Sequence, residues 1–194
     1  MKIAVYSPNW IGDSVLALPF IKALKNRYPN AILYLFCKEW VSDIYRNHPD
    51  IDNIISVPKA SLDSFIGTIK CGFKLRKIKL DYFFTLTDSF RSALVLRISG
   101  SLKTIGYKSQ MRSFLLTDSR SKSKLTIHRS KKYLALLSAY EKLTIKPYFY
   151  ISPNEEKWGL KEMKKIGMDK PIGLFPFSVS NKRTISNSTI IKLI

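Results

Sequence analysis

The chain is poor in the residues that build metal centres, and it has no long apolar run. Its two cysteines, Cys37 and Cys71, have no partner at metal-ligand spacing, so we expect buried or free thiols in a reducing compartment. Only five uncharged residues separate Lys2 from Pro8, which argues against a signal peptide. No apolar run approaches the roughly 18 residues of a membrane span. We therefore expect a cytoplasmic protein that meets a membrane only at its surface.

Acidic residues are also scarce. The 194 residues contain 33 Lys and Arg against 14 Asp and Glu, which gives a formal net charge of +19. A hydrophobic content of 45% is enough for a globular core. Such a charge implies a polyanionic partner. Nucleic acid, an anionic membrane surface and a phosphorylated glycolipid all remain open on charge alone.

Nucleotide-binding and nucleic-acid-binding motifs are missing. The first loop holds one glycine, Gly12, where the dinucleotide-binding fingerprint needs three. There is no Walker A lysine pattern, and no helix-turn-helix, RNA-recognition or zinc pattern supports a nucleic-acid binder. A basic nucleic-acid-binding protein is therefore retained only as an alternative.

Apolar runs and helical periods alternate along the chain. Strands are predicted at 3–7, 31–37, 54–57, 82–86 and 103–106, and helices at 14–27, 39–46, 61–77, 90–98 and 133–143. This alternation predicts an α/β fold with a parallel doubly wound sheet and right-handed crossovers. The stretch 107–132 is basic and has only weak periodicity, so no regular element is predicted there.

The end of the chain has the pattern of a second domain. Residues 147–153 look like a linker, and a helix is predicted at 154–166, a strand at 172–175 and a helix at 186–194. One strand and one helix cannot bury a core by themselves. We therefore expect residues 151–194 to be a linker helix and the beginning of a further α/β domain.

Asp13 is the first candidate for catalysis. It follows a strand through the loop Pro8–Gly12, and open α/β sheets carry their ligands at the carboxyl ends of such strands. It is interpreted either as a cap of the following helix or as a general base. Asp88, Ser89 and Arg91 occupy a second strand-to-helix loop, where they would either cap a helix or face the same cleft.

Cations are concentrated in two stretches. Between 107 and 132 there are eight cations and one acid, Asp118, a composition typical either of a solvated loop or of a site for phosphate and carboxylate groups. The helix predicted at 61–77 has basic residues between its apolar positions, which suits a core helix with a wet side or a membrane-surface contact. His128 stands among cations and is either structural or an anion ligand.

A third polar loop comes near the end of the chain. Hydroxyl and cationic groups at a helix start can form a diphosphate cradle, although the same composition is found in ordinary exposed loops. The residues with that potential are Ser178, Ser180, Lys182 and Arg183.

Several motifs in order resemble the family 9 glycosyltransferases, the ADP-heptose:lipopolysaccharide heptosyltransferases, and most closely their heptosyltransferase II branch. They are Trp10-Ile11-Gly12-Asp13, then Asp88-Ser89-Phe90-Arg91-Ser92-Ala93-Leu94, Gly106-Tyr107, Met111-Arg112, Leu115-Leu116-Thr117-Asp118, and His128 with Tyr133-Leu134-Ala135-Leu136. The resemblance covers nearly the whole chain.

The resemblance implies a two-domain GT-B architecture. Residues 1–150 would be an amino-terminal Rossmann-like domain that binds the acceptor, the phosphorylated Kdo–lipid A inner core of lipopolysaccharide, at the cytoplasmic surface of the inner membrane. Transfer from ADP-heptose would be inverting and would need no metal or other cofactor. Asp13 would be the general base, and Lys182 would contact the donor diphosphate. The acceptor-binding residues implied are Asn9, Trp10, Gly12, Asp88, Ser89, Arg91, Lys108, Arg112, Arg120 and His128.

The donor side departs from the family pattern. The loop 176–185 lacks the family's glycine and its Trp-Pro pair, and the Asp-Thr-Gly … His motif of the donor domain is not found. The 194-residue form is therefore expected to be inactive alone, as a fragment, a truncated product or a partner of a separate donor-domain chain. A non-catalytic remnant that binds an anionic glycolipid is the other alternative.

Overall fold

The computed structural model describes residues 1–123, 127–137, 148–167, 173–175 and 184–192. These residues divide into two compact units, Met1–Ile151 and Ser152–Ile194.

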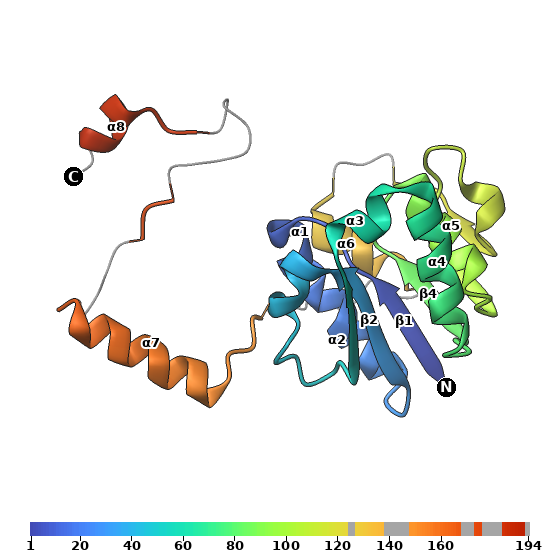
Figure 1. Ribbon diagram of the computed structural model, residues 1–194, viewed down its shortest axis with the longest axis horizontal. Helices are drawn as coiled ribbons and strands as arrows, with labels where there is room; N and C mark the ends of the chain where they lie inside the picture. The colour runs from blue at the N-terminus through green and yellow to red at the C-terminus, as the bar shows by residue number, and fades with distance from the viewer. Residues whose placement is uncertain (124–126, 138–147, 168–172, 176–183, 193–194) are drawn as a thin grey trace. The chain divides into compact units, whose positions relative to one another are not determined.

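The first unit is built on a six-stranded parallel sheet (Figure 1). Its strands lie in the order β3-β2-β1-β4-β5-β6, so that Val5 of β1 stands between Leu35 of β2 and Phe84 of β4. The strands are β1 Lys2–Tyr6, β2 Ile32–Lys38, β3 Asn53–Val57, β4 Tyr82–Thr85, β5 Lys103–Tyr107 and β6 Asp118–Arg120. This order is that of a doubly wound sheet, and the predicted α/β class is confirmed.

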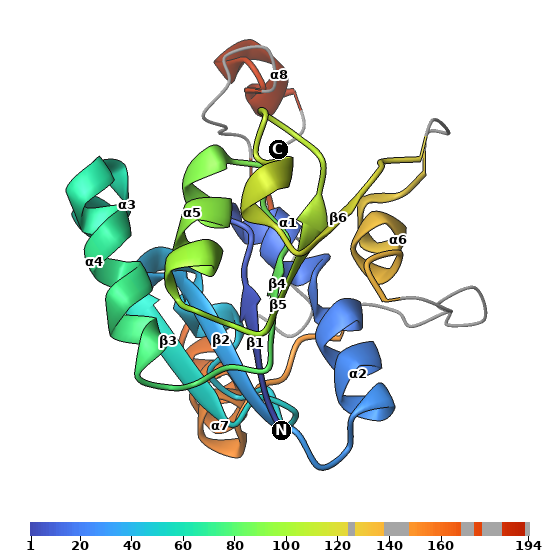
Figure 2. The same cartoon turned by 90° about the vertical axis from the view of Figure 1, so that its right-hand side faces the viewer.

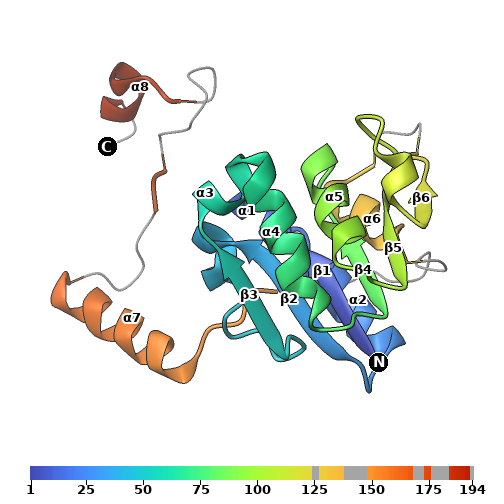
Figure 3. The same cartoon turned by 45° about the vertical axis from the view of Figure 1, so that its right-hand side comes forward.

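Helices cover both faces of this sheet (Figures 2 and 3). Alternate residues of β1 point to opposite faces, so Ile3 and Val5 pack in one core cluster while Ala4 and Tyr6 pack in the other. The first cluster includes α2 Leu18–Arg27 and α6 Arg129–Leu134, and the second includes α4 Phe65–Arg76 and α5 Phe90–Ile98. Burial on both faces explains why β1 and β2 are almost continuously apolar.

Two helices predicted as continuous are each broken. The prediction of one helix over 14–27 is wrong, because α1 Ile11–Val15 ends before α2 begins at Leu18, with Pro19 in the first turn. Proline has no N–H to donate but fits the first turn of a new helix. The segment 61–77 likewise divides into α3 Lys59–Asp63 and α4, since the Ser64 hydroxyl accepts from the Gly67 amide and caps α4.

The basic stretch 107–132 contains more structure than its pattern predicts. It forms the 3-10 helix η2 Ser113–Leu115, the short strand β6 and the start of α6, which begins at Arg129 instead of the predicted Tyr133. Backbone pairing with β5 holds β6 in place, and a strand of three residues has no readable alternation. The segment 39–46, predicted as a helix, forms the 3-10 helix η1 Glu39–Ile44.

Helix α4 approaches α5 closely through a glycine. A Cβ placed on Gly72 would lie 2.6 Å from Ile98 Cβ, far inside van der Waals contact. Thr68, Cys71 and Leu75, which share this side of α4, are buried. Gly72 therefore fixes which side of α4 faces the protein.

A histidine is buried under the last described segment of the first unit. The His48 ring lies 4.6 Å from the Tyr150 ring, and the His48 Nδ1 accepts from the Asp50 amide. Burial lowers the pKa of His48 from 6.5 to about 4, with a smaller opposing effect of Asp50 and a further lowering by Lys22. The imidazole is therefore neutral in the folded protein near neutral pH.

The second unit contains α7 Pro153–Lys165 and α8 Asn187–Ile191. A capping box of Ser152 and Glu155 begins α7. Lys164 and Lys165 occupy its last turn, where their positive charges interact favourably with the negative end of the helix dipole. The described part of the strand predicted at 172–175, residues 173–175, lies outside any helix or strand. Among the described residues, no helix combines the length and the apolar character needed to cross a bilayer.

We expect Gly72→Ala to destabilise the first unit by about 1–3 kcal/mol, although alanine favours helices, because the new Cβ overlaps Ile98. Urea unfolding followed by circular dichroism measures this. Gly159→Ala in α7 is the matched control, since a Cβ there meets nothing within 4 Å. Equal free energies of unfolding for wild type and Gly72→Ala would contradict the close approach.

Acid should weaken the fold through His48. Its pKa is about 4 in the folded protein and 6.5 ordinarily, so the unfolded chain binds the extra proton between these values and stability falls as the pH decreases below 6.5. The urea concentration at the unfolding midpoint should therefore decrease as the pH is lowered from about 7 to about 5. His48→Gln should flatten this dependence, whereas His128→Gln, at the exposed start of α6, should leave it unchanged. If the urea midpoint of His48→Gln changed with pH as steeply as that of wild type, the role assigned to His48 would be refuted.

Candidate functional site

Two loops meet where the sheet changes its direction of winding. The chain leaves β1 toward α1 on one side and leaves β4 toward α5 on the other, and these two strands are neighbours. A crevice opens beyond the carboxyl ends of the strands at such a switch point, and ligands bind there in open α/β sheets. Asp13 and Asp88, predicted from different parts of the sequence, belong to these two loops.

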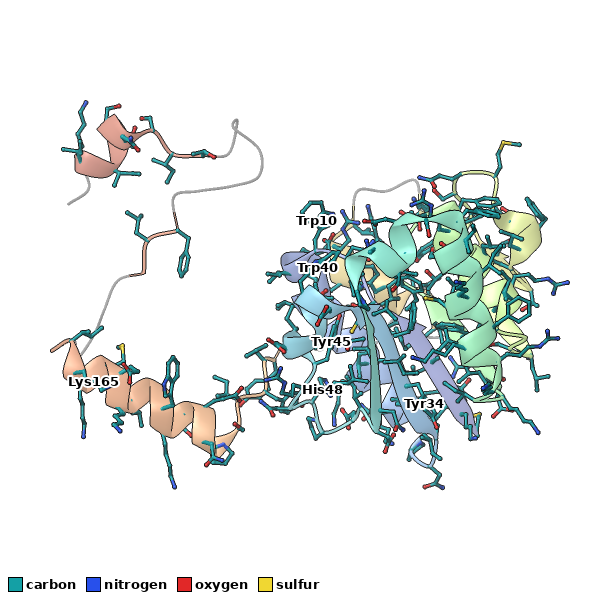
Figure 4. The ribbon with its side chains drawn as sticks, in the orientation of Figure 1. Trp10, Tyr34, Trp40, Tyr45, His48 and Lys165 are labelled. Atoms are coloured by element: carbon teal, nitrogen blue, oxygen red, sulfur yellow. The ribbon has the colours of Figure 1, made fainter. Side chains whose placement is uncertain are left out.

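A buried group of hydroxyls holds the first loop. The Tyr45 and Ser7 hydroxyl oxygens lie 2.6 Å apart, Ser14 Oγ donates to the Pro8 carbonyl at 3.2 Å, and Tyr45, labelled in Figure 4, also donates to the Ser14 carbonyl at 3.3 Å. Burial raises the pKa of Tyr45, so its proton stays available for these bonds. The Trp40 indole adds a bond of 2.9 Å to the Asn9 carbonyl. The loop is thus fixed from beneath while its outer side remains accessible.

Asp13 does not cap a helix. The N-cap of α1 is Trp10, which makes no side-chain capping bond, and Asp13 lies in the first turn. Its Oδ1 is 3.4 Å from Arg129 Nε, and 26% of its side chain is exposed. Burial raises the pKa of the neighbouring Tyr133, and the negative charge of Asp13 raises it further. The capping interpretation is therefore not supported, and the carboxylate is placed beside a cation and a neutral phenol.

A basic pocket lies next to this carboxylate. Its volume is about 490 Å³, a size typical of small-molecule sites. Among the described residues that line it, Asp88 is the one acid, and the cations are Arg120, Lys122, Arg129 and Lys132. Arg129 both lines this pocket and pairs with Asp13. The pocket thus offers charge for an anion within reach of a carboxylate.

Asp88 closes one side of the pocket through two ion pairs. Lys122 Nζ lies 2.7 Å from Asp88 Oδ2, and Arg112 Nη2 lies 3.7 Å from Oδ1. Ser89 caps α5 by accepting from the Ser92 amide at 3.2 Å. Both interpretations of this loop therefore hold in part, since Ser89 caps the helix and Asp88 faces the pocket.

Arg112 does not have the position predicted for it. As an acceptor-binding residue it would be accessible, yet its side chain is 0% exposed. Its guanidinium donates to the Tyr107 carbonyl at 2.9 and 3.0 Å, to the Ser89 carbonyl at 3.0 Å and to Ser92 Oγ at 3.0 Å. Burial lowers the pKa of Arg112, and Asp88 opposes this. The residue ties the loop after β4 to the loop after β5, because the buried guanidinium finds its partners there.

The other predicted residues divide between the pocket and its surroundings. Arg120 lines the pocket, Asn9 and Trp10 lie in the loop after β1, and Gly12 lies beside Asp13 in the first turn of α1. Arg91 is directed elsewhere, since it donates to the Leu62 carbonyl of α3 at 3.4 Å. Lys108 and His128 are not among the lining residues, although His128 immediately precedes Arg129.

Several pocket residues were not among the predicted site residues, and Lys132 is one of them. Lys122, Arg129 and Tyr133 acquire their roles from β6 and the start of α6, which the pattern did not predict. For the two cations the signal in the sequence was the density of cations in the stretch 107–132, whereas Tyr133 belongs to the motif Tyr133-Leu134-Ala135-Leu136 that resembles the family.

The predicted donor-binding residues Ser178, Ser180, Lys182 and Arg183 lie outside the described residues. Within the described part of the chain, no three His, Cys, Asp or Glu side chains gather in a way that could hold a metal ion.

Known proteins resemble this chain in sequence. The profile of glycosyltransferase family 9 (heptosyltransferase) matches residues 69–183. Lipopolysaccharide heptosyltransferase 2 of Escherichia coli (strain K12) is 33% identical over 147 residues, which are 73% of this chain and 41% of that protein. Lipooligosaccharide heptosyltransferase 2 of Haemophilus influenzae is 27% identical over 175 residues, 85% of this chain and 50% of that protein. The chain spans two fifths to one half of the length of these relatives.

Solved structures agree with this. The structure of the Escherichia coli ADP-heptose lipopolysaccharide heptosyltransferase II matches with a TM-score of 0.71 and 26% identity, over 87% of this chain and 51% of that one. The glycosyltransferase family 9 structure from Veillonella parvula matches with a TM-score of 0.87 over 99% of this chain and 58% of that one, and at 18% identity it supports the fold. The six-stranded sheet corresponds to one GT-B domain, and the chain belongs to glycosyltransferase family 9, the heptosyltransferases.

Proposed function

We propose that this chain forms the acceptor-binding part of a lipopolysaccharide heptosyltransferase, with Asp13 as the general base. The observation that carries the proposal is the double role of Arg129, which pairs with Asp13 and lines the basic pocket. A single cation therefore connects the candidate base to the candidate anion site. The relatives whose names include lipopolysaccharide or lipooligosaccharide heptosyltransferase support this choice of substrate.

The proposed reaction is an inverting sugar transfer. The acceptor hydroxyl oxygen forms a bond to the anomeric carbon of the heptose while the bond from that carbon to the ADP oxygen breaks. The hydroxyl proton passes to the Asp13 carboxylate, and the electron pair of the broken bond leaves with ADP. The diphosphate would be held by Ser178, Ser180, Lys182 and Arg183, with no metal or other cofactor required.

The basic pocket suits the acceptor proposed here. The phosphorylated Kdo–lipid A inner core carries phosphates and carboxylates, and Arg120, Lys122, Arg129 and Lys132 would form charge-assisted hydrogen bonds with such groups. An acceptor anion that takes Arg129 would also free Asp13 Oδ1 to receive a proton. Asn9, Trp10 and Gly12 would border the acceptor sugar, and a Cβ on Gly12 would meet nothing within 4 Å, so the fold itself does not demand glycine there.

Arg112 serves this site indirectly in our proposal. It supports Asp88 and the Ser89 carbonyl from beneath, so that Asp88 can hold Lys122 at the pocket. Its bonds also join the loops after β4 and β5, and the first of these loops contributes Leu86 and Asp88 to the pocket. Arg112 is therefore a positioning residue instead of an acceptor ligand.

The double variant Lys122→Ala/Arg129→Ala should weaken binding of deep-rough lipopolysaccharide by roughly tenfold or more, because two charge-assisted contacts are lost. Lys157→Ala/Lys161→Ala on α7 of the second unit removes the same charge from residues that do not line the pocket and is the matched control. Binding is measured by titration at two salt concentrations. Equal losses for both double variants would mean that net charge alone drives binding.

Asp13→Asn should leave lipopolysaccharide binding within about twofold of wild type, since a base is needed for transfer and not for binding. With ADP-heptose and deep-rough lipopolysaccharide, mass spectrometry should find no heptose transfer by the 194-residue chain alone, which matches only part of its relatives. Turnover by the chain would overturn that expectation, and turnover that survived Asp13→Asn would exclude Asp13 as the base. Tighter retention on DNA than on lipopolysaccharide at matched salt would favour the nucleic-acid alternative.

Arg112→Met should lower the free energy of unfolding by about 3 kcal/mol or more, because the Tyr107 and Ser89 carbonyls lose their buried donors. Arg112→Lys should recover only part of this, since lysine lacks the planar fork. Arg97→Met at an exposed position of α5 should cost less than about 0.5 kcal/mol. Urea unfolding provides the measurement, and a neutral Arg112→Met would show that the guanidinium is not needed by the fold.

A further inference from the structure

Helix α4 exposes large apolar side chains on the outside of the first unit. Phe65, Ile66 and Phe73 are 56%, 68% and 53% exposed. Soluble proteins expose single apolar residues routinely, but three large ones on a helix of this length are a patch. In Figures 1 and 3 the helix lies outside the sheet with α5 beside it. We call the exposed side, made of Phe65, Ile66, Lys70, Phe73, Lys74 and Lys77, the outer face of α4.

The orientation of α4 is fixed by its opposite side. Gly72 packs against Ile98 of α5, and Cys71 and Leu75 belong to the buried core. Ile66 and Phe73 share one side of the helix, because seven residues complete nearly two turns. Both are exposed, so this side faces away from the buried one. The exposure of the outer face is thus imposed by the packing that buries the inner one.

The outer face combines these apolar groups with positive charge. Lys70 lies between Ile66 and Phe73 along the same side, and Lys74 and Lys77 continue it. The only acid in the sequence of α3 and α4 is Asp63. Its Oδ1 lies 3.6 Å from Lys38 Nζ, so its negative charge is balanced by that lysine. Lysine stems can lie along an apolar surface while their ammonium groups reach polar headgroups.

Aromatic groups join this face to the loop of Asp13. Lys38, which pairs with Asp63 of α3, also lies 4.8 Å from the centre of the Trp40 ring. Trp40 in turn donates to the Asn9 carbonyl, and Trp40 and Trp10, labelled in Figure 4, are 44% and 63% exposed. Tryptophan is favoured where water meets lipid headgroups. Side chains suited to a bilayer surface therefore continue from α3, which directly precedes α4, to the edge of the candidate site.

We infer that the outer face of α4 docks the protein on a bilayer that contains anionic lipids. A partly inserted helix of this kind buries its apolar side chains at the boundary of headgroups and acyl chains, while its basic residues contact anionic headgroups. The positive charge complements such lipids, and the net charge of +19 adds long-range attraction. The inference rests on the proposed function only for its biological purpose, which is to bring the Asp13 loop to a membrane-bound acceptor.

Vesicle binding tests this without the acceptor. Sedimentation with phosphatidylcholine vesicles that contain about 30 mol% phosphatidylglycerol, and with phosphatidylcholine alone, measures the partition coefficient of the full chain. Binding should require the anionic lipid. Ile66→Ser/Phe73→Ser and, separately, Lys70→Glu/Lys74→Glu should each reduce partitioning by roughly tenfold. Circular dichroism and the urea midpoint confirm that each variant is folded.

Matched controls separate docking from general adhesion. Leu102→Ser removes an apolar side chain that is 73% exposed outside α4, and Lys157→Glu/Lys161→Glu makes the same charge change on α7. Both should bind within about twofold of wild type. Equal losses for controls and α4 variants, or wild-type binding by Ile66→Ser/Phe73→Ser, would overturn the inference.

A parallel measurement of DNA binding tests whether the outer face of α4 binds nucleic acid instead of lipid. If Lys70→Glu/Lys74→Glu weakened binding of double-stranded DNA while vesicle binding stayed unchanged, the outer face would be a nucleic-acid surface and the inference would be wrong. Because the vesicles contain no lipopolysaccharide, failure here would leave the roles proposed for Asp13 and the basic pocket untouched. Loss of lipopolysaccharide binding by the pocket variants would likewise not affect the vesicle result.

Discussion

The arrangement of this domain depends on the requirement that parallel strands be joined by crossovers. Winding proceeds outward from β1 through β2 to β3, and then restarts beside β1 with β4. Right-handed crossovers in opposite directions put helices on both faces and lead the loops after β1 and β4 to the two sides of one crevice. Asp13 and Asp88 reach one region for this reason, although 75 positions of the sequence separate them. The neighbouring strands β1 and β4 bring them together.

The sequence was informative where burial governs the pattern. Residues Ile3–Tyr6 of β1 and most of β2 are buried, with alternate side chains of β1 on opposite faces, and the period of 90–98 reproduces the observed helix. The loop of Asp13 could be located because it follows the first of these strands. Its supporting bonds could not, since Ser7, Ser14 and Tyr45 have ordinary polar side chains whose meeting depends on the tertiary fold.

The basic stretch shows the limit of reading charge along a chain. Arg112, Lys122 and Arg129 have similar charges, yet one is buried under two loops, one pairs with Asp88 and one pairs with Asp13. Their different positions arise from η2, β6 and α6, which are too short to produce a clear period. Composition therefore left both a solvated loop and an anion site open in this region, and it could not assign the individual residues.

The pairing of β1 also bears on synthesis of the chain. This strand is translated before the other strands of the sheet and pairs with β2 soon afterwards, but its other neighbour, β4, begins only at Tyr82. At the usual pace of a ribosome that interval lasts on the order of seconds, during which one edge of β1 has no partner. The nascent chain thus exposes an unpaired, aggregation-prone strand edge before the sheet is complete. A chaperone that covers the roughly eighty residues up to β4 for a time on the order of seconds would protect this edge.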